Sequence, residues 1–124
     1  MSSAIAGLNE FGQSPWYDNL TRPLITGGGL QQLIDDDGIR GVTSNPTIFE
    51  KAMSAGDAYD DELKQCAAEG LSIEDSYWRI VLDDVGHAAD HFTPIYDSTG
   101  GGDGFVSVEV APDLAHDSAA TIEQ

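Results

Sequence analysis

The sequence predicts an α/β protein built on a short parallel sheet. Strand-like segments with alternating side chains are followed three times by segments with helical spacing of apolar residues. Glycines and prolines separate these segments, and such alternation is typical of βαβ units, in which helices connect parallel strands. Three strands cannot close a barrel, so both outer strands would have an unpaired edge. The length of 124 residues allows one domain or part of one.

We interpret residues 1–124 as a single incomplete domain. Residues 1–13 are a leader segment, and the first unit begins after it. Residues 14–18 predict a short strand, because they are aromatic and have a proline at the entry. A helix is expected next, ending at Gly38, which suits a helix C-terminus. Its apolar residues have helical spacing: Leu30, Leu33 and Ile34.

The second unit starts with a strand predicted over residues 39–44. Asn45 and Pro46 then mark a helix start, because asparagine is a good N-cap and proline at the first helical position leaves no amide hydrogen unpaired. An apolar stripe is expected to continue this helix as far as Gly70. Its members are Tyr59, Leu63, Cys66 and Ala67.

A long amphipathic helix is predicted over residues 72–92, where apolar residues recur every three or four positions. Ser72 and the residues after it resemble a capping box. His87 and His91 lie one turn apart on this helix, with several aspartates nearby, and two such histidines can ligate zinc. A third ligand at a typical spacing is missing, so we expect a solvated face and no metal site.

The third strand is predicted over residues 105–110, after a glycine-rich connector. Three valines share one face of this strand and suit packing under helices: Val106, Val108 and Val110. Glu109 lies on the opposite face, at the C-terminal end of the strand. Pro112 is expected to open a last helix, whose apolar stripe runs to Ile122.

Charge and cysteine content limit the partners and the compartment. Five Lys and Arg residues stand against 22 Asp and Glu residues, so the formal net charge is −17. This excludes a free-standing nucleic-acid binder and docking on an anionic membrane surface, both of which need clustered cations. Cys66 is the only cysteine, and no apolar run is long enough to span a bilayer, which predicts a cytoplasmic protein.

Four polar residues at the strand ends form the candidate site. If the apolar faces of the strands pack under the helices, the inward-facing residues are Asp18, Thr43, Asn45 and Glu109. The C-terminal ends of parallel strands are where α/β barrels hold their reacting groups. Two carboxylates in different environments can divide proton removal from proton delivery, and an amide can hold a hydroxyl group.

Three motifs resemble the first strands of transaldolases. Residues 41–49 (GVTSNPTIF) resemble the second-strand signature, residues 106–112 (VSVEVAP) the third-strand motif, and residues 16–20 (WYDNL) the first strand of the longer, actinobacterial-type members. The match covers about residues 8–124. It implies the N-terminal portion of a transaldolase, with about the first three βα units of a TIM (β/α)8 barrel.

The resemblance also implies an activity. Transaldolases transfer a dihydroxyacetone unit between sugar phosphates of the pentose phosphate pathway, from sedoheptulose 7-phosphate to glyceraldehyde 3-phosphate, through a lysine Schiff base and without a metal or organic cofactor. By this resemblance Asp18 handles the proton of the hydroxyl group whose loss cleaves the carbon–carbon bond. Glu109 acts through a water on carbinolamine formation and dehydration. Asn45 binds the substrate, and Thr43 is a second substrate-binding candidate.

The Schiff-base lysine of transaldolases lies on the fourth strand, and no residue of this chain matches it. The two lysines, Lys51 and Lys64, fall in the helical stretch after the second strand, and the family's phosphate-binding residues come from later strands. We therefore expect the isolated chain to be inactive. Three alternatives stay open: a non-catalytic half-barrel fragment that self-assembles or pairs through open strand edges, an acidic metal-binding helix protein, and a Schiff-base aldolase with another donor sugar.

Overall fold

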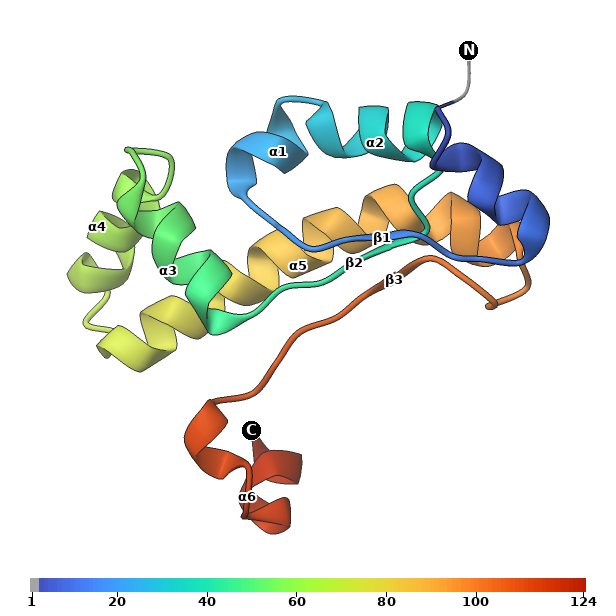
Figure 1. Cartoon of the computed structure of the whole chain (residues 1–124). Coiled ribbons are helices and arrows are strands. Elements are labelled where there is room, and N and C mark those ends of the chain that lie inside the picture. Colours follow the sequence, from blue (N-terminus) through green and yellow to red (C-terminus); the bar gives the residue numbers. More distant parts are fainter. Residues whose placement is uncertain (1–2) are drawn as a thin grey trace.

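The computed structural model describes residues 3–124 and shows helices around a three-stranded parallel sheet (Figure 1). The strands are β1 (Trp16–Tyr17), β2 (Gly41–Val42) and β3 (Phe105–Val106), and they lie in that order. Both pairs are parallel, with Gly41 opposite both Trp16 and Phe105. The predicted α/β class with parallel strands is confirmed. Residues 1–2 of the predicted leader segment lie outside the described residues.

The strands are shorter than predicted. Each pairing extends by one backbone hydrogen bond at either end. Before the strands, the Arg40 N–H donates to the Pro15 carbonyl at 2.8 Å and the Gly104 N–H to the Arg40 carbonyl at 2.9 Å. After them, the Thr43 N–H donates to the Tyr17 carbonyl at 3.0 Å and the Ser107 N–H to the Val42 carbonyl at 2.9 Å. Within residues 3–124, β1 and β3 have a neighbour on one side only. A strand with one neighbour forms half of its possible ladder, which is consistent with the early end of β1 and β3 relative to residues 14–18 and 105–110. The central strand β2 is equally short relative to residues 39–44, because it can extend only as far as its two partners do.

Helices connect and flank the strands. Between β1 and β2 lie α1 (Arg22–Thr26) and α2 (Gly29–Asp37). Between β2 and β3 lie α3 (Pro46–Ser54), α4 (Asp60–Ala68) and α5 (Ile73–Ser98). The 3-10 helix η1 (Ala6–Phe11) precedes β1 and occupies part of the predicted leader, while η2 (Pro112–Leu114) and α6 (Ser118–Glu123) follow β3. None of the helices in the described part of the chain combines the length and apolar character needed to cross a bilayer.

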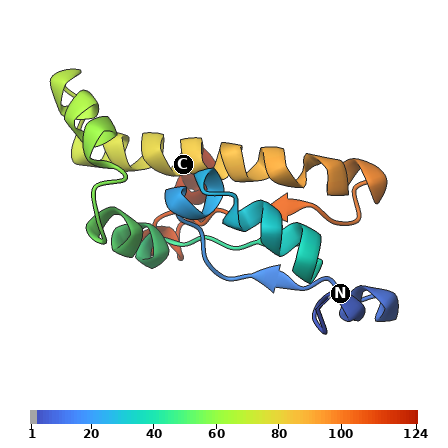
Figure 2. The ribbon, with the colours of Figure 1, turned by 90° about the horizontal axis from the view of Figure 1, so that it is seen from above.

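The core lies between the sheet and the helices. Figures 1 and 2 show α1, α2 and α5 gathered on one side of the three strands. Val42 is fully buried on that side, and Tyr17 and Val106 pack against the same cluster, as the predicted alternation requires. On the other side Trp16 is 40% and Phe105 is 44% exposed. The face that we expected to point inward in a closed barrel is therefore open to solvent.

The helix predicted from Asn45 to Gly70 is wrong as a single element. It divides into α3 and α4, with a break at residues 55–59 that contains Gly56. Tyr59, at the end of the break, is 1% exposed and donates its hydroxyl hydrogen to Asp84 at 2.8 Å. Burial of this side chain against α5 turns the chain, and α4 starts afresh behind it.

The long helix begins as predicted but ends six residues later. Ser72 caps α5, because its Oγ accepts a hydrogen bond from the Asp75 N–H at 3.0 Å. The helix then continues past Phe92, through Pro94, to Ser98. Proline removes one helical hydrogen bond. Burial of the apolar side chain of Ile95 favours the extra turn, and Ile95 is 9% exposed in the core.

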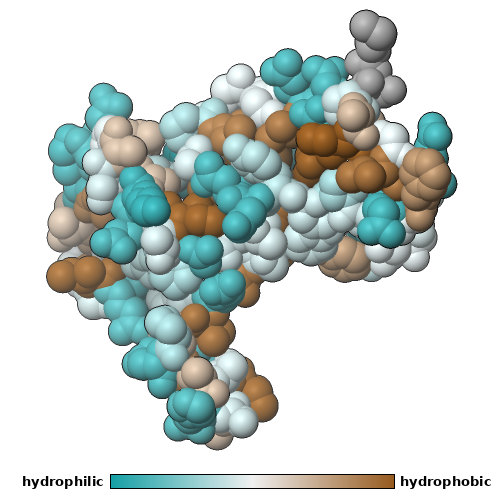
Figure 3. All heavy atoms as spheres, viewed as in Figure 1, coloured by the Kyte–Doolittle hydropathy of each residue, from teal (hydrophilic) through white to brown (hydrophobic). Residues whose placement is uncertain are grey.

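The end of the chain also differs from prediction. The helix expected from Pro112 is a 3-10 turn followed by α6, which Asp117 caps by accepting the Ala120 N–H at 3.0 Å. Figure 1 shows this segment projecting from the body of the protein, and Figure 3 shows both hydrophobic and hydrophilic surface on it. The prediction that all three valines pack under helices is wrong for Val108, which is 44% exposed because the chain leaves the sheet after β3.

Candidate functional site

A cavity of about 460 Å³ lies at the C-terminal ends of the strands. It brings together three of the four predicted site residues, Asp18, Asn45 and Glu109, each from a segment that follows a different strand. The rest of its wall is the first two turns of α3 and the segment after β3: Pro46, Thr47, Ile48, Lys51, Val110 and Pro112.

Thr43, the fourth predicted residue, is linked to this cavity through Asp18. Its Oγ1 donates a hydrogen bond to Asp18 Oδ1 at 2.5 Å, and Thr43 does not itself line the wall. Asp18 follows β1 directly and Thr43 follows β2, so the parallel pairing of these strands sets the distance between them. A hydroxyl donor fixes the rotamer of the carboxylate, and Thr43 thus orients Asp18.

Asn45 caps helix α3, as its sequence context predicts, and it also lines the cavity. Its Oδ1 accepts the Ile48 N–H at 2.9 Å, which makes it the N-cap of α3. The cap uses the oxygen of the amide and leaves the two hydrogens on the nitrogen as donors. Because Asn45 also lines the cavity, those donors can meet a hydroxyl or carbonyl oxygen of a ligand.

Glu109 and Lys51 complete the charged groups of the cavity. Glu109 is exposed and comes from the extended segment after β3. Lys51 comes from the second turn of α3, and the sequence pattern placed it only within a helix. The signal that could have found it is geometric: long side chains on a helix lean toward its N-terminus, which here is the end that faces the cavity.

Behind Asp18, Arg22 holds the loop that follows β1. Its Nε donates to Asp84 at 2.8 Å and its Nη1 donates to Glu62 at 2.5 Å. Its backbone N–H donates to the Tyr59 hydroxyl at 2.8 Å, and its guanidinium lies 4.6 Å from the centre of that ring. Burial raises the pKa of Tyr59. These residues are far apart in sequence, and no local motif pointed to them.

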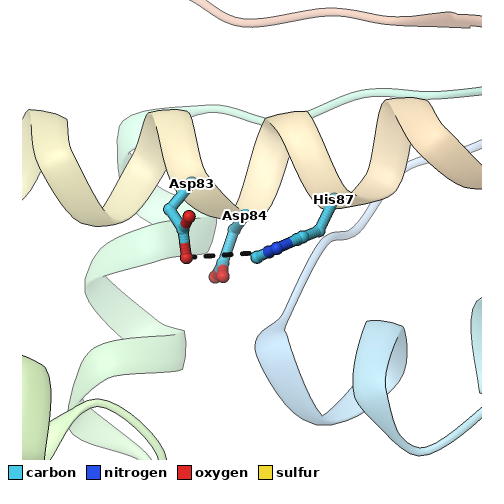
Figure 4. A group of neighbouring side chains, drawn as sticks. All are labelled: Asp83, Asp84 and His87. Carbon is cyan, nitrogen blue, oxygen red and sulfur yellow. Dashed lines mark ion pairs between the residues drawn. The ribbon is translucent and has the colours of Figure 1, made fainter.

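The two histidines of α5 do not form a joint metal site. Asp83, Asp84 and His87 bring ligand atoms within 4.8 Å of one another, and Figure 4 shows the three side chains on one side of the helix. Asp84, however, already accepts hydrogen bonds from Arg22 and Tyr59. His91 points elsewhere, since its Nδ1 lies 2.9 Å from Gln31 Oε1 on α2.

Comparison with known proteins gives a consistent set of relatives. Residues 15–124 match the family model described as Transaldolase/Fructose-6-phosphate aldolase. A protein named Transaldolase 2 from Streptomyces coelicolor is 46% identical over all of this chain and 33% of its own length. The transaldolase of Kocuria rhizophila is 45% identical over 98% of this chain and 33% of its own length. That of Thermobifida fusca is 42% identical over all of this chain and 34% of its own length. The chain thus spans about a third of the length of these relatives.

Proposed function

The chain belongs to the transaldolase/fructose-6-phosphate aldolase family, and on that premise we propose that it forms part of a transaldolase active site. The family implies a TIM-barrel-type α/β fold, with which the three-stranded parallel sheet is consistent. In this proposal the chain supplies about the first three βα units of one barrel domain. The observation that carries the proposal is the shared cavity of Asp18, Asn45 and Glu109.

The proposed reaction moves a dihydroxyacetone unit between sugar phosphates. Sedoheptulose 7-phosphate and glyceraldehyde 3-phosphate give erythrose 4-phosphate and fructose 6-phosphate, as in the cytoplasmic pentose phosphate pathway. The ketose carbonyl forms a Schiff base with a lysine that this chain does not supply. The chain alone is therefore inactive in this proposal, and its own residues act on protons and on the sugar hydroxyls.

The two carboxylates divide the proton transfers. Asp18, fixed by Thr43, takes the proton of the hydroxyl group whose loss breaks the carbon–carbon bond. Glu109 delivers and removes protons through a water while the carbinolamine forms and dehydrates. Asn45 donates to a sugar oxygen from the amide nitrogen that its cap leaves free.

A fusion enzyme tests this function. In it, the present chain replaces the part of the Streptomyces coelicolor relative that it matches. We expect transaldolase activity, and we expect Asp18→Asn and Glu109→Gln each to lower kcat by about 10²- to 10⁴-fold, the range of general acid–base groups. A well-folded fusion enzyme without activity would refute the proposal.

A second assay examines the chain alone. We expect no covalent adduct when it is incubated with fructose 6-phosphate and borohydride, because no residue of the chain matches the Schiff-base lysine. An adduct at Lys51 or Lys64 would overturn this part of the proposal. In the fusion enzyme, fructose 6-phosphate cleavage without an added acceptor would instead indicate an aldolase.

Self-association is a second candidate function, and the sheet itself favours it. Within residues 3–124, the outer edges of β1 and β3 have no paired strand, and Trp16 and Phe105 are exposed on the open face. An assembly of several copies would cover these edges. Size-exclusion chromatography with light scattering decides the matter, because a folded monomer at high concentration contradicts the assembly.

A further inference from the structure

The cations of this chain are few, and nearly all of them are held by other side chains. The chain has five Lys and Arg residues against 22 Asp and Glu residues. Four of the five have a side-chain partner: Arg22 with Asp84, Arg40 with Asn9, Lys64 with Asp61, and Arg79 with Glu69. Among residues 3–124, Lys51 is the one cation whose side chain forms neither an ion pair nor a hydrogen bond.

Lys51 also has a distinctive place, because it lines the cavity that holds the candidate site residues. Asp18 and Glu109 line the same cavity, yet within the described chain neither carboxylate pairs with the lysine ammonium. Its three donor hydrogens are therefore available to a ligand. An ammonium on a flexible four-carbon stem acts as a movable point charge, which suits a phosphate group.

The charge balance of the cavity means that a cation in its wall favours an anionic ligand. The chain carries a net charge of −17, and two carboxylates line this wall. A phosphate dianion entering the cavity meets repulsion from both carboxylates over the screening length of about 8 Å. A neutral sugar needs no such compensation, because carboxylates and the Asn45 amide can bind its hydroxyl groups.

We infer that Lys51 binds the phosphate group of the phosphorylated ligand in this cavity. The inference rests on the proposed function for the identity of that ligand as a sugar phosphate. The family resemblance implies phosphate-binding residues on later strands. Lys51 adds to that set one phosphate contact from this part of the barrel. Lys51 thereby favours phosphorylated over unphosphorylated sugars.

The first test uses the full chain and inorganic phosphate. Phosphate is titrated into isotope-labelled protein while the side-chain signal of each lysine is followed by NMR, with chloride as the control for ionic strength. We expect a saturable shift at Lys51 and none at Lys64, and we expect Lys51→Met to weaken phosphate binding about tenfold while Lys51→Arg retains it. Lys64→Met is the matched control, since Lys64 is 73% exposed and lies on α4 away from the cavity. Equal binding by the wild type and Lys51→Met would overturn the inference.

The second test uses the fusion enzyme and measures KM and the preference between two sugars. Loss of folding would lower the activity toward both sugars equally and would not change that preference. We expect Lys51→Met to raise the KM for fructose 6-phosphate about tenfold with a smaller change in kcat, and to reduce the preference for fructose 6-phosphate over fructose. An equal effect on both sugars, or none, would contradict a phosphate contact. If the fusion enzyme is inactive, the proposed function fails, while the phosphate titration still decides the role of Lys51.

Discussion

Arg22 donates a hydrogen bond at 2.8 Å to Asp84, a carboxylate that is 1% exposed, and so joins the loop after β1 to the middle of α5. Asp18 stands four residues before Arg22, in the loop that ends where Arg22 begins α1. Thr43 holds Asp18 from the neighbouring strand, so the loop is fixed at both of its ends. The position of a proposed proton-transfer group thus depends on a buried ion pair on the far side of the sheet.

Removal of the Asp84 charge is expected to destabilise the fold. Asp84→Asn leaves the Arg22 guanidinium, with a side chain 19% exposed, without its buried partner. Arg22 keeps its ion pair with Glu62, so the expected loss is about 3 kcal/mol, the lower end for breaking a buried pair. Urea unfolding should show this as a lower midpoint. The neighbouring Asp83→Asn is the control, because Asp83 is 50% exposed and lies 3.6 Å from Arg22, and it should cost less than about 1 kcal/mol. Equal losses in both variants would contradict a special role for Asp84.

Stability is also expected to fall in alkaline solution because of Tyr59. Burial raises the pKa of this hydroxyl above its ordinary value of about 10. The folded protein therefore keeps a proton that the unfolded chain releases, so the contribution of Tyr59 is fully present below pH 10. It is lost as the pH rises above 10 toward the folded pKa. The free energy of unfolding, measured against pH, should decline less steeply above pH 10 in Tyr59→Phe. Parallel declines would exclude this residue as the cause.

Side-chain alternation explains why much of the fold could be predicted. Tyr17, Val42 and Val106 come from three separate strands, and each lies on the face that a period of two assigns to the core. The same period assigns Asp18 and Thr43, which directly follow β1 and β2, to one side. Glu109 lies beyond the end of β3, yet it shares a cavity with Asp18, from which 91 positions separate it in the sequence.

Contacts between helices could not be predicted in this way. Arg22 and Asp84 are 62 residues apart, and neither position differs in local sequence pattern from the exposed charged residues of this acidic chain. Proline normally signals the end of a helix, so the extension of α5 through Pro94 depends on the burial of Ile95, which only tertiary packing reveals. Lys51 could be assigned to a helix, but its approach to the cavity requires the position of α3 relative to β1 and β3.

Thr43 is expected to matter for turnover rather than for folding. Thr43→Val keeps the branched shape and removes the hydroxyl that donates to Asp18. In the fusion enzyme we expect a lower kcat with little change in the unfolding midpoint, because the bond is exposed. Thr43→Ser keeps the donor and should keep most of the activity. A Thr43→Val enzyme with unchanged kcat would show that the hydrogen bond has no part in orienting the carboxylate.

Two glycines are expected to respond to alanine in opposite directions. A Cβ at Gly41 would overlap the indole ring of Trp16, which lies across this glycine on the open face of the sheet. Gly41→Ala should therefore displace the ring, lower the free energy of unfolding by about 1–3 kcal/mol, and alter the tryptophan fluorescence. Gly86 lies within α5 with nothing within 4 Å of the added carbon. Gly86→Ala should raise the stability by about 0.5–1 kcal/mol, because alanine restricts the unfolded chain and favours the helix. Thermal unfolding of both variants checks the pair, and a neutral Gly41→Ala would mean that Trp16 does not occupy this position in solution.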